Sequence, residues 1–432
     1  MHKLPTLTDD FLKEEIYCAD ICGVNVFFLP KPKFRRRYAE LCVNYGSNDN
    51  VFVPRGRAEP VEVPAGVAHF LEHKMFEKPW GDAFSAFSSI GASANAYTSN
   101  NYTSYHFVTL DNYDKGLALL MEVVFSPYFT EESVEREKRI IAQEIGMYED
   151  QPNWRLLRET LARLYPEHPV GLDISGTYES IQQIHKDTLY LCHENFYSPA
   201  NCVLFMAGDF DPDQALNLAA EIIGSYVKDP GNSPCRIRPH GTGRVGEGAE
   251  IMMSVPTPLL QIGWKDRRLF DGRKIVIREL ACAFLLDIMF GKTSEFFEEV
   301  YDQGLTDDLI FSYEAWPDYG FTIVSAETEK PEILKEMIFE QVERIRTRGL
   351  DEQDFERKKN AALGRFITMF RSFEVISQSQ IRLFGLGENI FSYRSILEDL
   401  DISDVYASFD SLDPDMSVSV IIANEGVSMD ET

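Results

Sequence analysis

Basic residues are scarce in this chain relative to acidic ones. There are 42 Lys and Arg against 69 Asp and Glu, which gives a formal net charge of −27 over 432 residues. A surface this acidic repels phosphate backbones and anionic lipids, so nucleic acids and membrane surfaces are excluded as favoured partners. Long apolar runs are also missing, because none reaches the roughly 18 residues that span a bilayer. The chain begins without the apolar stretch of a secretory signal, so we expect a cytoplasmic protein.

Cysteines are few and odd in number. The seven are scattered along the chain, which is typical of reduced thiols in a large cytosolic protein rather than of a disulfide framework. Signals for two other kinds of chemistry are absent as well. No glycine-rich phosphate loop follows an expected strand, and no G-x-S-x-G elbow offers a nucleophile. Nucleotide binding and serine hydrolase chemistry are therefore disfavoured.

The organisation of the chain indicates an internal duplication. TEESVEREKRIIAQE at 130–144 and DEQDFERKKNAALGR at 351–365 place apolar, Glu, Arg, charged and Lys residues in the same order, at an offset of 221 residues. An offset near half the chain favours a duplication over a solenoid, although two unrelated amphipathic helices of similar charge remain the alternative.

A hydrophobic fraction of 44% is that of a globular chain. Strand-like and helical patterns are mixed in both halves, so together with the duplication they predict the α+β class with two homologous half-domains, each a mixed sheet packed on helices. We predict an N-terminal domain over 1–228, a Gly- and Pro-rich linker over 229–248 and a C-terminal domain over 249–432.

Local patterns place the elements around the richest motif. A helix is expected to begin near Pro64 and to cover AHFLEHKMFEK, because proline favours the first helical turn. SANAYTSNNYTSYHFVTL alternates polar with small or aromatic residues, as a pair of strands does. A second helix is expected from Thr130, a suitable N-cap, to about Tyr148.

His69-Phe70-Leu71-Glu72-His73 carries the strongest chemical signal. Residues at positions i, i+3 and i+4 share one face of a helix, so both imidazoles and the carboxylate of Glu72 point the same way. Phe70 and Leu71 would anchor the opposite face in the core. This spacing favours a zinc site, and the alternative is a surface helix whose polar side chains are merely solvated.

A catalytic zinc site usually has three protein ligands, so a third is needed. Glu137 and Glu144 lie two helical turns apart and point the same way. We expect a buried face around them, formed by Ile140, Ile141 and Ile145. The alternative is that both glutamates are solvated and pair with Lys138, Arg139 or Lys74.

HFLEH followed by Glu144 within EREKRIIAQEI resembles the inverzincin arrangement of the pitrilysin/insulinase family of zinc peptidases. GASANAYTSNNYTSYHF is similar to the edge-strand segment of that family, and EHPVGLDISGTYESIQQI and NFYSPANCVLFMAGDF are similar to two further segments. Together these stretches cover most of residues 60–210.

The resemblance implies a zinc metalloendopeptidase that acts on peptides or unfolded segments. It implies His69, His73 and Glu144 as ligands of Zn²⁺, Glu72 as the general base and Glu137 as a carboxylate that supports a ligand or proton transfer. It also implies that Asn95 and Ala96 lie on an edge strand that pairs with the substrate backbone. Basic peptides suit the net charge, and the family implies a homodimer or a heterodimer with a related non-catalytic chain.

The second half departs from this pattern. Under the 221-residue offset, the positions of His69, Glu72, His73, Glu137 and Glu144 are taken by Phe290, Thr293, Ser294, Lys358 and Arg365. Relatives carry an Arg and a Tyr that help to hold substrate, whereas EEVYDQGLTDDL here places Tyr301 near the Arg position. Tyr301 is therefore a candidate substrate-binding residue. The rival function is a non-catalytic peptide-binding or assembly subunit.

Overall fold

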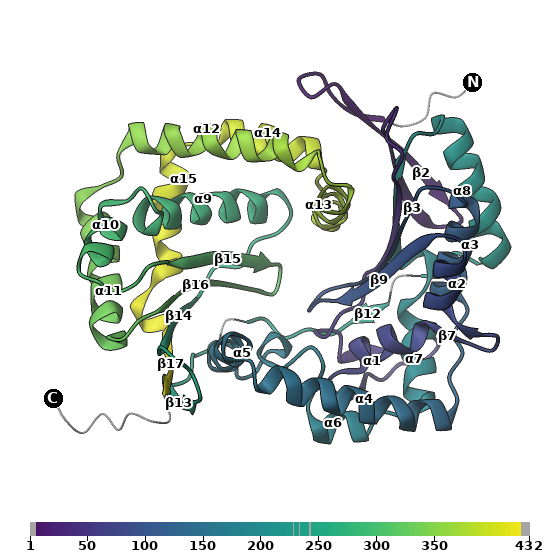
Figure 1. Ribbon diagram of the computed structural model, residues 1–432, viewed down its shortest axis with the longest axis horizontal. Helices are drawn as coiled ribbons and strands as arrows, with labels where there is room; N and C mark the ends of the chain where they lie inside the picture. The colour runs from purple at the N-terminus through teal and green to yellow at the C-terminus, as the bar shows by residue number, and fades with distance from the viewer. Residues whose placement is uncertain (1–5, 228, 233, 242, 425–432) are drawn as a thin grey trace. The chain divides into compact units, whose positions relative to one another are not determined.

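The computed structural model describes residues 6–424 except 228, 233 and 242. The chain forms two compact units (Figure 1). The first contains the residues up to Ile145 together with Asp173–Arg238 and Phe370–Arg382, and the second contains Gly146–Leu172, Pro239–Met369 and the residues from Leu383 onward. Within the described ranges, no helix combines the length and the apolar character needed to cross a membrane.

In chain order, the elements that lie wholly or mostly in the first unit are β1 (Thr6–Asp9), β2 (Glu14–Ile21), β3 (Val24–Pro30), β4 (Arg37–Val43), β5 (Val51–Val53), β6 (Val61–Glu62), α1 (Val67–Met75), β7 (Glu77–Lys78), β8 (Gly81–Asp82), α2 (Ala83–Ser89), β9 (Ala92–Thr98), β10 (Thr103–Thr109), α3 (Tyr113–Phe125), α4 (Glu131–Glu149), α6 (Tyr178–Gln182), α7 (Lys186–Phe196), η2 (Pro199–Asn201), β11 (Cys202–Gly208), α8 (Pro212–Tyr226), β12 (Cys235–Arg236) and α13 (Phe373–Gly385).

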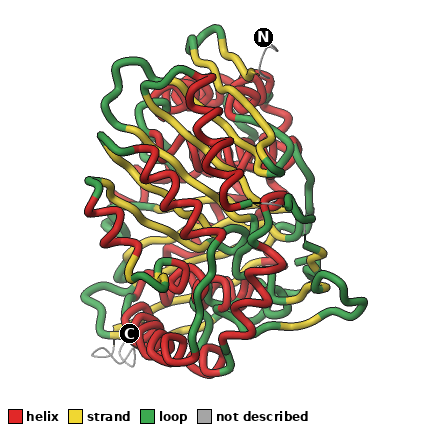
Figure 2. The backbone as a smooth tube through the Cα atoms, turned by 90° about the vertical axis from the view of Figure 1, so that its right-hand side faces the viewer, coloured by secondary structure: helices red, strands yellow, loops and turns green. Residues whose placement is uncertain are grey.

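The main sheet of the first unit has seven strands in the order β1-β2-β3-β11-β4-β10-β9, with β9 at one edge. Strands β3 and β11 run parallel, and the pairs β11–β4, β4–β10 and β10–β9 are antiparallel. Helices α1, α2, α3 and α8 pack against this sheet (Figures 1 and 2). Alternate residues of β4, such as Ala39 and Leu41, point into the core beneath these helices. Phe70 and Leu71 of α1 are fully buried in the same core, as the sequence predicts.

In the second unit, the elements are α5 (Pro152–Leu164), η1 (Pro169–Gly171), β13 (Ala249–Met253), β14 (Leu259–Lys265), α9 (Arg273–Phe290), α10 (Glu295–Asp302), β15 (Ile310–Trp316), β16 (Tyr319–Glu327), α11 (Pro331–Arg348), α12 (Glu352–Met369), α14 (Ile390–Asp399), α15 (Ile402–Ala407), η3 (Ser408–Leu412), η4 (Pro414–Met416) and β17 (Ser417–Asn424).

The sheet of the second unit repeats the topology of the first. Its strand order is β13-β17-β14-β16-β15, in which β13 and β17 run parallel and the other three pairs are antiparallel. These strands correspond one by one to β3, β11, β4, β10 and β9. Helix α4 begins at Glu131 and α12 begins at Glu352, which is the offset that the sequence predicts. The α+β class and the duplication are therefore confirmed.

Helix α5, from the first half of the sequence, belongs to the second unit, and most of helix α13, from the second half of the sequence, belongs to the first unit. Helices α5 and α13 both have 13 residues and begin at the same 221-residue offset. Helix α5 packs on β14 and β17 of the second unit, where Gly263 leaves space for Thr160 and Leu164. In the first unit, Phe373 of α13 lies against Tyr38 of β4. The compact units therefore do not follow the predicted domain boundaries, which assigned 146–172 to the first domain and 370–382 to the second.

Part of the predicted linker is built into the first unit. Strand β12 pairs with β5, and the side chains of Arg236 and Arg238 lie 3.1 and 2.8 Å from the buried carboxylate of Asp49. A carboxylate removed from water needs such partners, so these two arginines fasten the segment 234–238 to the unit.

Helix α1 begins at Val67, slightly later than the sequence predicts, because Gly66 precedes it with a left-handed backbone (φ +92°). A Cβ atom at Gly66 would lie 2.5 Å from the backbone oxygen of Ser175. This close approach fixes where the helix starts and how it enters the core, and it requires glycine.

We predict that Gly66→Ala destabilises the first unit more than Gly91→Ala does. Gly91 also has a left-handed backbone (φ +78°), but nothing lies within 4 Å of a Cβ atom there. Both variants should lose about 1–2 kcal/mol from backbone strain. Gly66→Ala should lose about 1–3 kcal/mol more, because the added methyl group meets a backbone that cannot move freely. Urea denaturation measures both, and equal losses would contradict the close-approach argument.

Candidate metal centre

Two helices of the first unit bring the predicted ligands together. Helix α1 presents His69 and His73 on one face, and α4 presents Glu144. The distance from His69 Nε2 to one carboxylate oxygen of Glu144 is 3.8 Å, and the distance from His73 Nε2 to the other oxygen is 3.4 Å. One ligand atom from each residue lies within 4.8 Å of the others. Among the described residues, this is the only such group of three His, Cys, Asp or Glu side chains.

This donor set fits a zinc ion. Imidazole nitrogens and a carboxylate are ligands that zinc takes in catalytic sites, and ligand atoms of one tetrahedral ion lie about 3.3 Å apart. The three residues are neither fully exposed nor fully enclosed, which leaves one side of the group accessible. The Nδ1 atom of His69 is buried and has no hydrogen-bond partner within the described part of the chain.

Glu137 forms a hydrogen bond with the ring nitrogen of His73 that does not face Glu144. One of its carboxylate oxygens lies 3.0 Å from His73 Nδ1, and the other lies 3.9 Å from the Nζ atom of Lys74, which is fully buried. A carboxylate can only accept here, so Nδ1 carries the proton and donates it to Glu137. The lone pair of His73 is then on Nε2, which is the nitrogen that faces Glu144. Glu137 is therefore placed to orient a ligand.

The pKa values of the two histidines shift in opposite directions. Burial and the nearby His73 lower the pKa of His69 to about 3, so its imidazole is neutral at neutral pH. Burial alone would lower the pKa of His73, but the hydrogen bond with Glu137 and the charges of Glu137, Glu144 and Glu72 raise it above its ordinary value. Metal binding must displace protons from this group, because only neutral imidazole binds a metal.

Glu72 lies on the same face of α1 and is held from the edge strand. The hydroxyl group of Thr98, at the end of β9, donates a hydrogen bond to Glu72 Oε2 over 2.7 Å. Burial raises the pKa of Glu72, and the hydrogen bond from Thr98 and the nearby His73 oppose that rise. Thr98 was not predicted as a site residue, although it belongs to the edge-strand segment that carries the family resemblance.

A pocket of about 720 Å³ opens beside these residues. Its walls include Glu72, His73 and Glu137 together with the predicted substrate-binding residues Asn95 and Ala96. Strand β9 pairs only with β10 in the described sheet, so the other edge of β9 is available to a further strand. Two aromatic rings that the sequence did not single out, Phe76 and Phe84, also line the pocket, and their centroids lie 3.9 Å apart.

The alternative pairings expected for the glutamates are wrong except at Lys74. Lys138 pairs with Glu135 at 2.6 Å, so it does not neutralise either glutamate of the site. The expected isoleucine face is correct for Ile141 and Ile145, which are buried, and wrong for Ile140, whose exposed fraction is 45%. Successive helical residues differ in direction by about 100°, so Ile140 and Ile141 do not share the core-facing side.

Tyr301 belongs to the second unit, whereas this group belongs to the first. It is on α10 of the second unit, where its side chain is 56% exposed and its ring stacks on that of Phe297. Its contact with substrate stays a prediction.

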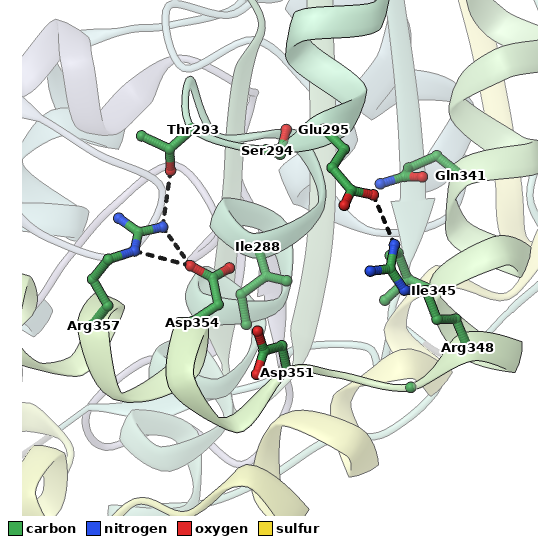
Figure 3. Close-up of a pocket in the computed structure, with 11 residues that line it drawn as sticks. Ile288, Thr293, Ser294, Glu295, Gln341, Ile345, Arg348, Asp351, Asp354 and Arg357 are labelled. Carbon is green, nitrogen blue, oxygen red and sulfur yellow. Dashed lines mark hydrogen bonds and ion pairs between the residues drawn. The ribbon is translucent and has the colours of Figure 1, made fainter.

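The second unit has a pocket of about 580 Å³ lined by Thr293, Ser294 and Arg357 among others (Figure 3), and no group of three His, Cys, Asp or Glu side chains that could hold a metal ion lies there among the described residues. Thr293 and Ser294 stand where the first half has Glu72 and His73, and Lys358 stands where it has Glu137. The Nζ atom of Lys358 lies 2.8 Å from a carboxylate oxygen of Asp287 and 3.3 Å from the hydroxyl of Thr293. Figure 3 shows Arg357 bonded to Thr293 and Asp354. Under the 221-residue offset, Lys358 therefore takes the place of Glu137, and no histidine stands at the positions of His69 and His73.

Comparisons with known proteins agree with the fold and with the family resemblance. Residues 43–178 match the family model "Insulinase (Peptidase family M16)", and residues 183–362 match "Peptidase M16 inactive domain". A relative from Bacillus subtilis (strain 168), the uncharacterized zinc protease YmfH, is 38% identical over 399 residues, which are 91% of this chain and 93% of that protein.

Solved structures agree as well. A putative M16-like peptidase from Alicyclobacillus acidocaldarius superimposes with a TM-score of 0.91 at 32% identity, over 98% of this chain and all of the other. Pitrilysin, at 16% identity, shares the fold with a TM-score of 0.75 over 98% of this chain and 46% of its own length. Fold and relatives thus define a protein of the zinc-protease class. The chain belongs to the pitrilysin/insulinase family, peptidase family M16.

We predict that Glu144→Gln weakens zinc binding more than Glu137→Gln. Glu144 faces both imidazole Nε2 atoms, so the substitution removes a charged ligand, whereas Glu137 acts through His73. Loss of such an outer partner costs about 10- to 100-fold in metal affinity, and loss of the ligand should cost more. Zinc titrations with a chromophoric competitor measure both affinities. Glu135→Gln, on an exposed part of α4, is the matched control. Equal weakening in the two variants would overturn the ligand assignment.

Proposed function

We propose that the chain is a zinc-dependent endopeptidase that hydrolyses peptides or unfolded segments. The observation that supports this most strongly is the convergence of His69, His73 and Glu144 beside Glu72, in a pocket that reaches the edge strand β9. The residues that this proposal assigns as metal ligands, general base and substrate edge thus all belong to one unit of the molecule.

In this proposal, His69, His73 and Glu144 hold the zinc ion, and Glu137 keeps His73 in the tautomer that binds it. Bound there, zinc would lower the pKa of a water molecule to about 7 and polarise the scissile carbonyl. The donor set supports this assignment. Neutral His69 offers the lone pair of its Nε2 atom, and Glu144 offers a carboxylate oxygen on the same side.

Glu72 is the general base. It would take a proton from the attacking water and pass it to the amine nitrogen of the leaving peptide as the C–N bond breaks. Burial favours the protonated form of Glu72, which suits a group that must hold this proton between the two steps. Its position on the pocket wall beside His73 supports this role.

Strand β9 would bind the substrate backbone. An extended peptide that adds to a free sheet edge is held by main-chain hydrogen bonds, which tolerate many sequences. The backbone N–H of Ala96 donates to the side-chain oxygen of Asn95 at 2.9 Å, so a polar group already covers this part of the edge. A substrate carbonyl that replaces the Asn95 oxygen would bond to the same N–H. Folded proteins cannot present a free strand in this way, which is why we expect unfolded substrates.

Three further features belong to the proposal. The net charge of −27 favours basic peptides over acidic ones. The exposed ring of Tyr301 is a candidate contact for substrate from the second unit. We also expect a homodimer, or a heterodimer with a related non-catalytic chain, in solution.

The rival function is a non-catalytic subunit that binds peptides. The match of residues 183–362 to an inactive domain favours it for the second half, where Lys358 replaces a site carboxylate. The ligand group of the first half favours turnover instead.

We predict that Glu72→Gln abolishes most turnover while zinc stays bound. Gln cannot take a proton from water, and loss of a general base costs about 10²- to 10⁴-fold in kcat. A mixture of unstructured peptides is digested, and mass spectrometry identifies the cleavage sites. A fluorogenic peptide that contains one of these sites then serves as the substrate for measuring kcat. Elemental analysis of the same samples gives the zinc content, and Glu135→Gln serves again as control. A wild-type chain that binds zinc but cleaves none of the peptides would support the non-catalytic function.

A further inference from the structure

The strand that would receive the substrate also holds the general base. Thr98 lies two residues after Ala96 on β9, and its hydroxyl donates to Glu72 Oε2 over 2.7 Å. We infer that Thr98 is a positioning residue for Glu72, which it fixes in the orientation needed to take a proton. This inference rests on the proposed function and assigns a role to a residue that the ligand and base assignments leave out.

The hydrogen bonds of the two neighbouring hydroxyl groups, on Thr98 and Thr103, indicate that Thr98 donates its proton to Glu72. The hydroxyl of Thr103, opposite Thr98 on β10, donates to the backbone oxygen of Tyr45 at 2.9 Å. The oxygens of Thr98 and Thr103 are 3.3 Å apart, a longer contact than the one to Glu72. Each hydroxyl has a single proton, and a charged acceptor binds it more strongly than a neutral one. The proton of Thr98 therefore points to Glu72.

The two oxygens of Glu72 are consequently unequal. Oε2 is held by Thr98, whereas Oε1 has no hydrogen-bond partner among the described residues. The last torsion of a glutamate is broad, so an unheld carboxylate turns freely and spends part of its time misdirected. With Oε2 fixed, Oε1 is the oxygen that faces the reaction and takes the proton from water.

Location on β9 links this positioning to substrate binding. Residues two apart on a strand point to the same side of the sheet, so Ala96 and Thr98 both face α1. A peptide that pairs with the free edge of β9 fixes the strand and, through Thr98, the direction of the base. The merely structural role of Thr98 would be to satisfy a buried carboxylate, and that role predicts lost stability or lost zinc rather than slower turnover.

The experiment compares Thr98→Val, which removes the hydroxyl at nearly constant shape, with Thr98→Ser, which keeps it. Thr109→Val is the matched control, because Thr109 is a buried threonine of the same hairpin whose hydroxyl bonds to the backbone of Asp111. Each zinc-loaded full-length variant is assayed for kcat, KM, zinc content and urea stability with the same peptide.

We expect Thr98→Val to keep zinc and KM close to the wild-type values and to lose about 10- to 100-fold in kcat, the effect of one hydrogen bond to a charged group. Thr98→Ser should restore most of the kcat, and Thr109→Val should leave it unchanged. The inference is overturned if Thr98→Val turns over at the wild-type rate, if it loses its zinc, or if Thr98→Ser fails to rescue it.

Failure of the proposed function looks different. In that case the wild-type chain itself cleaves no peptide, or Glu72→Gln cleaves as fast as the wild type, and the role of Thr98 falls with it. An active wild type with an unaffected Thr98→Val removes the positioning role alone and leaves the endopeptidase intact.

Discussion

The meeting of Glu144 with two imidazoles is the interaction on which the account of this protein depends. Helices α1 and α4 are separated along the chain by two strand pairs and two helices, yet they bring His69, His73 and Glu144 within 4.8 Å of one another. Grouping these side chains has a cost, because all three are partly removed from water. A divalent cation between them would offset that cost, and Glu137 and Lys74 arrange charge around it.

The surrounding fold supplies the rigidity that such a site requires. Fully buried Phe70 and Leu71 fix the rotation of α1, and the close approach of Gly66 to Ser175 fixes its start. In the proposed function the edge strand β9 serves the site twice, because it would offer its unpaired edge to a peptide and it bonds to Glu72 through Thr98. Ligands, base and substrate edge thus belong to neighbouring elements of one unit, where small movements of one are felt by the others.

Helical spacing in the sequence was enough to predict that His69, Glu72 and His73 share a face, because that relation is local. The 221-residue offset also predicted the duplication, and it reappears in the starts of α4 and α12. Other features depend on tertiary packing and had no local signal. The bond from Thr98 to Glu72 joins a strand to a helix, and helices α5 and α13 have no sequence mark for the unit in which they pack. Ile140 is exposed although it is apolar, because its direction on the helix and not its residue type decides whether it faces the core.

The two halves show how one topology supports different chemistry. In the second half, Lys358 bonds to Asp287 and Thr293, so an ammonium group stands where the first half has the carboxylate of Glu137. The most direct test of the account is anomalous diffraction at the zinc edge from crystals of the zinc-loaded protein. The account predicts one strong peak in the first unit, about 2.0–2.2 Å from His69 Nε2, His73 Nε2 and a carboxylate oxygen of Glu144. No peak there, or a zinc ion held by Glu137 in place of Glu144, would contradict it.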